Sequence, residues 1–140
     1  MPASPGSLNT GSMRHQQRHG HVAEQFATDL GKLVIHSKDR AGFVVNALLI
    51  PYILSAIRMM ESGFASADEI DLGMVEGCAH PMGPLALADL IGLDTTMAVA
   101  ESLYEEFKEQ LYAPPSLLLR MVEAGLLGRK AGRGFYDYHR

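Results

Sequence analysis

The sequence predicts an all-α domain of about five helices, and three observations support this prediction. The chain has 140 residues, of which 47% are apolar, and this size and composition suit one globular domain. Between residues 42 and 125, apolar side chains recur at the three- and four-residue spacing of helices that bury one face. Glycines, prolines and capping residues interrupt this stretch at intervals of helical length and so separate one expected helix from the next.

Local signals place the ends of these helices. Gly63 ends the first helix, in which Pro51 can introduce a bend because proline removes a backbone donor. Ser66 and Glu69 have the spacing of a capping box at the start of the second helix. Asp94 is expected to cap the fourth, and two successive prolines start the fifth. The helices are expected at residues 42–62, 66–78, 85–91, 95–111 and 114–125.

The residues before the first of these helices have a different character. Proline, glycine and serine are frequent in residues 1–21, which predicts a disordered tail. Residues 22–30 predict a short helix, and residues 33–35 predict a strand that has no partner strand. His15, His19 and His21 could imitate a metal site, but no acidic or cysteine ligand lies near them. We therefore expect a solvated tail and no metal.

Charge and cysteine content restrict the classes of partner. The net charge of −4 and an isoelectric point near 5.8 give no reason to expect binding to nucleic acid. Cys78 is the only cysteine, which fits a reducing cytoplasm. The apolar run from Phe43 to Ile57 is closed by Arg58 and is shorter than the ~20 residues that span a bilayer. With no long apolar run at the N-terminus, we expect a cytoplasmic protein without a signal peptide and with no membrane partner.

Asn46 is the polar residue that most needs an explanation. Between Phe43 and Ala56, the only other polar side chains are those of Tyr52 and Ser55. A buried amide must find a hydrogen-bond partner, because an unsatisfied one costs about 1–3 kcal/mol. Either the fold satisfies Asn46 internally, or the side chain awaits a ligand.

Three segments resemble one known family. They are DRAGFVVNALLIPYILSAIRMMESG, HPMGPLALADLIGLDT and LLGRKAGRGFYDY, and they occur in this order. Together they resemble the C-terminal domain of the 3-hydroxyacyl-CoA dehydrogenases, most of all the short 3-hydroxybutyryl-CoA dehydrogenase type, over roughly residues 22–138. Ala41 stands where the family usually has proline.

The resemblance implies a domain organisation. Residues 38–140 would form a helical dimerisation and substrate domain similar to the C-terminal domain of 6-phosphogluconate dehydrogenase. Residues 22–37 would be the remnant of a preceding nucleotide-binding (Rossmann) domain, including its last strand.

The resemblance also implies a role in the oxidation of 3-hydroxyacyl-CoA by NAD. In the family, a catalytic histidine, the glutamate that orients it and the glycine-rich NAD fingerprint all belong to the first domain. No segment here matches them, and Glu24 does not match that glutamate. The resemblance assigns Asn46 a catalytic and substrate-binding role, because the matching asparagine orients the histidine and the thioester carbonyl. NAD is therefore expected for full-length members, while this chain alone should bind no cofactor and be inactive.

The expected partners are acyl-CoA, a nucleotide-binding domain supplied in trans and a second copy of the chain. One row of the first helix would form the seam of a homodimer. That row consists of Ile50, Leu54, Ile57 and Met60, with Leu49 and Ile53 alongside. A non-catalytic helical interaction module, or a truncated gene remnant, is the alternative.

Other polar residues have structural interpretations. His80 could be a general base, but no carboxylate with an orienting role adjoins it in sequence, and the resemblance makes it part of a structural turn. Asp89 and Asp94 are interpreted as caps or tertiary anchors, and Lys38 and Asp39 as a solvated helix entrance. The glycine-rich segment 128–134 lacks the context of a phosphate loop, and the resemblance makes it an anchor for the C-terminal residues. A contact from its Arg129 or Lys130 to an acyl-CoA phosphate stays open.

Overall fold

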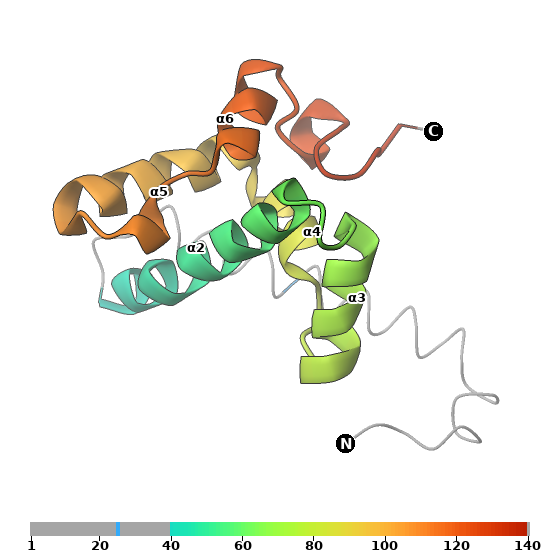
Figure 1. Cartoon of the computed structure of the whole chain (residues 1–140), viewed down its shortest axis with the longest axis horizontal. Coiled ribbons are helices and arrows are strands. Elements are labelled where there is room, and N and C mark those ends of the chain that lie inside the picture. The colour runs from blue at the N-terminus through green and yellow to red at the C-terminus, as the bar shows by residue number, and fades with distance from the viewer. Residues whose placement is uncertain (1–24, 26–39, 140) are drawn as a thin grey trace.

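The computed structural model describes Gln25 and residues 40–139, and the described part of the chain is helical (Figure 1). It contains no strand, and its isolated β-bridges join Arg133 to Gly128 and to Asp137. The all-α prediction is confirmed. The tail, short helix and strand expected within residues 1–37 lie outside the described residues, as do Lys38 and Asp39. The α-helices are α2 (Arg40–Glu61), α3 (Ala67–Cys78), α4 (Pro84–Ile91), α5 (Leu93–Phe107) and α6 (Ser116–Glu123), and the 3₁₀ turns are η1 (Gln110–Tyr112) and η2 (Arg129–Ala131).

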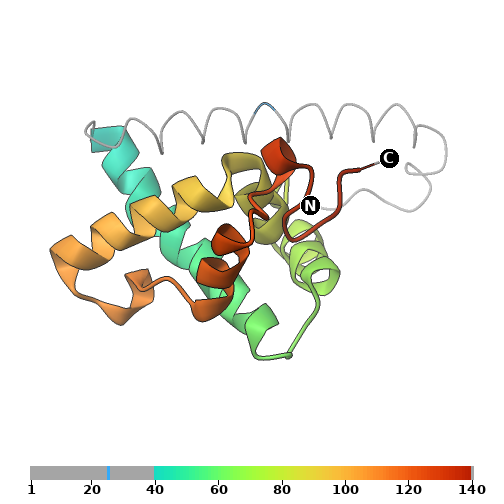
Figure 2. The same cartoon turned by 90° about the horizontal axis from the view of Figure 1, so that it is seen from above.

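The long helix α2 runs through the middle of the domain, and α4, α5 and α6 pack against it (Figures 1 and 2). Ile50, Ile53, Leu54 and Ile57 of this helix are fully buried. Their spacing of three and four residues puts them on one face, and the other helices cover that face. Full burial of each such side chain contributes about 1.5–3 kcal/mol, so this row forms much of the core.

The predicted dimer seam is therefore wrong in its residues. Four of its side chains, at positions 50, 53, 54 and 57, are already buried inside one chain and cannot meet a partner. The opposite face of α2 is the exposed one, and we call it the outer face. It presents Val44, Leu48, Ser55 and Met59, and Leu48 is 71% exposed. A helix that is apolar on both faces does not reveal from its sequence which face the rest of the chain will cover.

The expectation that this apolar run is too short for a membrane is also wrong. Over Gly42–Glu61, α2 is long and apolar enough to cross a bilayer by length and composition. The core helix of a soluble protein also passes this test of length and composition. The buried row of α2 is part of the hydrophobic core of this domain.

The boundary signals succeed best where they are local. The capping box is present, with the Glu69 N–H donating to Ser66 Oγ (3.2 Å) and the Ser66 N–H donating to Glu69 Oε1 (2.8 Å). The second helix ends at Cys78 as predicted, and Ala79 follows it in the left-handed conformation (φ 57°).

The fourth helix differs from its predicted bounds at both ends. It begins at Leu93 after Gly92, so Asp94 lies in its first turn and is not its cap. It ends at Phe107 rather than near Leu111, because Lys108 adopts the left-handed conformation (φ 54°). The chain then turns back through η1, which places the ring of Tyr112 beside that of Phe107.

Candidate functional site

Asn46 lies nearly two turns into α2 and is only 2% exposed. Its Oδ1 atom is buried, and no group in the described part of the chain donates a hydrogen bond to it. Most buried polar atoms in proteins have a partner, so an unsatisfied amide oxygen requires an explanation. Of the two alternatives for Asn46, the one that leaves it open to an outside hydrogen-bond donor fits this geometry.

His80 lies in the loop between α3 and α4 and contacts Tyr52 of α2. Tyr52 Oη is 3.0 Å from His80 Nδ1, and the two rings meet edge to face with centroids 5.6 Å apart. Burial raises the pKa of Tyr52 to about 12, and the nearby Asp71 and Cys78 add to this rise. Among the described residues, the partner of the imidazole is the Tyr52 hydroxyl, and no carboxylate bonds to it as in a catalytic His–carboxylate pair. The contact fits the structural turn inferred from the sequence.

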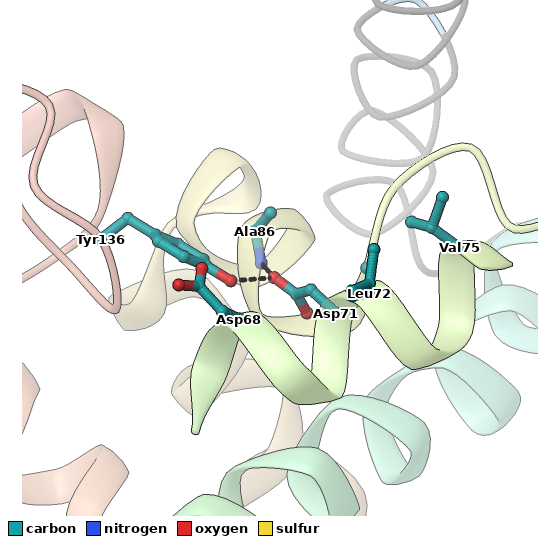
Figure 3. Close-up of a pocket in the computed structure, with 7 residues that line it drawn as sticks. Asp68, Asp71, Leu72, Val75, Ala86 and Tyr136 are labelled. Carbon is teal, nitrogen blue, oxygen red and sulfur yellow. Dashed lines mark hydrogen bonds between the residues drawn. The ribbon is translucent and has the colours of Figure 1, made fainter. Parts of the chain in front are cut away.

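Asp71 is a buried carboxylate whose role the sequence did not reveal. The backbone N–H groups of Leu85 and Ala86 donate to its two oxygens (2.8 and 2.9 Å), so Asp71 caps the start of α4. The hydroxyl of Tyr136 donates to the same carboxylate at 2.7 Å, as Figure 3 shows. A Cβ at Gly83 would collide with Asp71. The sequence held one signal for this role: Asp71 is an acidic residue that stands between the apolar residues Ile70 and Leu72.

Asp89 of α4 is also buried, and it is an anchor as predicted. The N–H groups of Phe135 and Tyr136 donate to its two oxygens (2.9 and 3.0 Å), and the hydroxyl of Tyr138 donates at 2.7 Å. Burial raises the pKa of the Asp89 carboxyl, although these three hydrogen bonds oppose the rise. Gly134 lies so close to Asp89 that a Cβ would collide with the carboxylate.

Asp94 is an anchor of a weaker kind, since it lies at the surface of α5. Its Oδ1 accepts the N–H of Thr95 (3.0 Å) and pairs with Lys130 Nζ (2.6 Å), which ties η2 to the start of α5. Lys130 is therefore engaged within the fold. Arg129 lies over the ring of Tyr138, 5.5 Å from its centroid.

The backbone of the glycine-rich segment 128–134 is largely bonded within the fold, unlike that of a phosphate loop. The N–H groups of Gly128, Ala131, Gly132 and Gly134 all donate to carbonyl oxygens within or beside the segment, at 2.9–3.1 Å. A phosphate loop needs free N–H groups that point at the ligand. The N–H groups that follow, at positions 135 and 136, are bonded to Asp89.

The residues that the structure describes do not form a binding site for NAD. A dinucleotide site requires a strand, a glycine turn and the free start of a helix. Residues 40–139 contain no strand, and the start of α4 is already occupied by the Asp71 carboxylate. Among the described residues, no cluster of three or more His, Cys, Asp or Glu side chains could hold a metal ion.

One shallow groove of about 440 Å³ lies between α3, the start of α4 and the C-terminal segment (Figure 3). Its two central polar groups, Asp71 and Tyr136, are hydrogen-bonded to each other. Burial and the Asp71 carboxylate raise the pKa of Tyr136 far above its usual range, so this phenol stays protonated. Tyr136 therefore does not exchange its proton near neutral pH. Its lining residues are Asp68, Asp71, Leu72, Val75, Gly83, Ala86 and Tyr136.

Residues 42–138 match the family described as "3-hydroxyacyl-CoA dehydrogenase, C-terminal domain". The chain belongs to this family. The resemblance seen in the three sequence segments is thereby confirmed.

The chain is similar to several curated dehydrogenases. It is 63% identical over 116 residues to the 3-hydroxybutyryl-CoA dehydrogenase of Mycobacterium tuberculosis strain H37Rv, a match that covers 82% of this chain and 41% of the relative. It is 47% identical over 117 residues to the enzyme of the same name from Bradyrhizobium diazoefficiens, covering 84% and 40%. The chain thus spans about two fifths of the length of these relatives.

Solved structures agree on the fold. The crystal structure of M. tuberculosis FadB2 superimposes with a TM-score of 0.69 at 64% identity, over 72% of this chain and 35% of that one. The (S)-3-hydroxybutyryl-CoA dehydrogenase PaaH1 from Ralstonia eutropha gives a TM-score of 0.67 at 56% identity, over 69% and 34%.

Proposed function

We propose that this chain is the C-terminal domain of an NAD-dependent 3-hydroxybutyryl-CoA dehydrogenase and that it contributes Asn46 to the active site. The observation that carries the proposal is the buried, unsatisfied Oδ1 of Asn46, within a family whose relatives bear that name. The chemistry is the oxidation of the 3-hydroxyl of an acyl-CoA to a ketone. NAD would bind to the preceding nucleotide-binding domain, since the described residues of this chain do not fit it.

The amide of Asn46 suits a positioning role beside a reacting centre. It stays neutral over the whole working pH range, and it offers two N–H donors and one acceptor. Because α2 holds it in a buried position, little reorganisation is needed when a ligand arrives. We infer that it exchanges hydrogen bonds with the thioester carbonyl of the substrate and with the histidine of the first domain.

We infer that the chain alone does not turn over substrate. His80 faces Tyr52, and His139 is exposed at the surface, so neither is paired with an orienting carboxylate among the described residues. The complete site would need a nucleotide-binding domain, either in trans or within a longer protein.

We also infer a homodimer, now through the outer face of α2. An exposed apolar row on a long helix is self-complementary when a second copy crosses it about a two-fold axis. The exposed thiol of Cys78 suits a reducing compartment, so a cytoplasmic location goes with the proposal.

The activity test uses the purified chain and the nucleotide-binding domain of the M. tuberculosis relative, each alone and mixed. NADH formation from 3-hydroxybutyryl-CoA is expected only in the mixture. Asn46→Ala should lower the restored rate by about 10²–10³, the usual effect of losing one preorganised donor. Ser102→Ala, an exposed polar change on α5, is the control and should leave the rate unchanged.

Three outcomes would contradict the proposal. Turnover by the chain alone that is lost on changing one of its own residues would show that it holds a complete site. An equal rate for the Asn46→Ala mixture would show that Asn46 is structural. A mixture that binds but never turns over would favour the non-catalytic interaction module.

The dimer test is sedimentation equilibrium at tens of micromolar. The wild-type chain should sediment at twice its mass of 15.2 kDa, and Leu48→Glu should sediment as a monomer. A wild-type monomer at that concentration would overturn the dimer.

A further inference from the structure

Three aromatic rings meet at the end of the molecule where α2 begins. Phe43 of α2 lies 6.1 Å from Phe107, the last residue of α5, and Phe107 lies 5.8 Å from Tyr112 of η1, measured between ring centroids. In both views of the chain, the start of α2 and the end of α5 lie at the same end of the molecule (Figures 1 and 2). We call Phe43, Phe107, Leu111 and Tyr112 the aromatic patch.

The aromatic patch is exposed although its side chains are large and apolar. Phe43 is 46% exposed and Phe107 is 37% exposed. Leu111, which precedes the half-buried Tyr112, is exposed as well. Single exposed apolar residues are ordinary on protein surfaces, but contiguous ones from three separate elements mark an interaction site. Aromatic residues are also enriched at the centres of interfaces.

The backbone holds this surface in a fixed shape. The Tyr112 N–H donates to the Glu109 carbonyl (3.0 Å), which closes η1. Arg58 of α2 donates to the Ala113 carbonyl at 3.2 Å and so fastens η1 to the helix. A preformed patch loses little conformational entropy on binding, which favours its use as a docking surface.

We propose that the aromatic patch is the docking surface for the nucleotide-binding domain that the proposed function requires, so this inference rests on that function. The partner is therefore a folded domain with an apolar contact area. Phe43 of the patch lies one turn after Arg40, where the described chain enters α2. The greater part of each curated relative lies outside the matched region, and the matching family is described as a C-terminal domain, so in those relatives the larger part precedes it.

The position of Asn46 agrees with this docking. Asn46 follows Phe43 by three residues, which is about one turn of helix or 4.5 Å along its axis. A domain seated on the aromatic patch would bring its own donors close to the unsatisfied Oδ1.

The patch and the outer face are separate surfaces. Leu48 follows Phe43 by five residues and so points about 140° away from it around the helix axis. A first domain on the patch and a second copy on the outer face can therefore be bound at once and tested independently.

The charges near the patch do not favour a strongly charged partner. Lys108 pairs with Glu105 at 3.2 Å, and Glu109 and Gln110 follow it at the surface. The mixed signs leave apolar contact as the main attraction.

The test measures binding of the full chain to the separately produced nucleotide-binding domain of the M. tuberculosis relative by isothermal titration calorimetry. Phe107→Glu and Leu111→Glu should each raise the Kd at least tenfold, because each puts a charge into an apolar contact. Leu72→Glu is the matched control: Leu72 is 61% exposed on α3, outside the patch, and this change should alter the Kd by less than twofold. Circular dichroism of each variant should match the wild type.

Three results would overturn the docking proposal. These are no binding by the wild-type chain, equal weakening by Leu72→Glu and Phe107→Glu, or a Phe107→Glu chain that sediments at half the wild-type mass. The last would make the patch a site of self-association.

The activity of the same mixtures separates this inference from the proposed function. If Phe107→Glu weakens binding but the saturated wild-type complex forms no NADH, the docking surface stands and the proposed function fails. If the wild-type mixture turns over and Phe107→Glu has an unchanged Kd, the function stands and the docking surface is elsewhere.

Discussion

The hydroxyl of Tyr136 donates to the carboxylate of Asp71 at 2.7 Å, across 65 residues of sequence. This bond joins the C-terminal segment to α3, and the bonds of Asp89 join the same segment to α4. Two buried carboxylates thus organise the part of the domain that carries no catalytic candidate. The unsatisfied amide of Asn46 lies outside this part, on α2. We therefore expect opposite effects on stability when an unsatisfied buried group and a satisfied one are replaced.

Replacing Asn46 with leucine should stabilise the isolated chain. Leucine has the same number of non-hydrogen side-chain atoms as asparagine and also branches at Cγ. The change removes a buried acceptor without a partner, which costs about 1–3 kcal/mol. Urea denaturation should show a higher midpoint with an unchanged slope. The same variant should be inactive in the two-domain mixture. A lower midpoint would mean that the Asn46 amide is satisfied and structural.

Replacing Asp89 with asparagine should destabilise the chain by about 1–3 kcal/mol. Asparagine keeps one acceptor oxygen, so at least one backbone N–H at Phe135 or Tyr136 loses its partner. Asp94→Asn is the control, because the Asp94–Lys130 pair is half exposed and should be worth less than about 1 kcal/mol. Equal losses in urea denaturation would contradict the assignment of Asp89 as the buried anchor.

Asp89 should also give the stability a specific dependence on pH. Burial raises its pKa in the folded state, so between the ordinary value of 3.8 and the raised value the folded chain binds more protons than the unfolded chain. The slope of the unfolding free energy with pH is then negative, and this contribution falls as pH rises through that interval. Unfolding measured from pH 3.5 to 7 should show this fall in the wild type relative to Asp89→Asn. A difference that grows with pH would show that the hydrogen bonds outweigh burial.

Two glycine-to-alanine changes should have opposite signs. A Cβ at Gly134 would collide with the Asp89 carboxylate, so Gly134→Ala should lower the thermal midpoint. Gly73 lies within α3 with open space around it, and Gly73→Ala should stabilise the chain by about 0.4–1 kcal/mol. Calorimetry of the two variants checks both signs. A tolerated Gly134→Ala would mean that the C-terminal segment is not held against Asp89.

The fold class and the local boundaries could be predicted from the sequence because their signals lie within a few residues. The Ser66–Glu69 capping box and the stop at Gly63 are of this kind. The role of Asp71 could not, since it depends on a partner far along the chain. For α2, periodicity identified a helix but could not tell its buried face from its outer one.

Asn46 is the part of the site that the sequence could indicate. Its amide stands out in an apolar helix, and the structure adds that the oxygen has no described partner. Its role in catalysis stays a prediction.

The long separation between the two anchoring carboxylates and their donors bears on the order of events during synthesis. The ribosome makes α3 and α4 well before residues 135–138. The donors in this segment follow Asp89 by 46 to 49 positions, and Tyr136 follows Asp71 by 65. Until that segment emerges, Asp71 can cap α4, but the Asp89 carboxylate has none of its final donors and must remain hydrated. The nascent helices can therefore associate early, whereas close packing around Asp89 forms only after residues 135–138 have been synthesised.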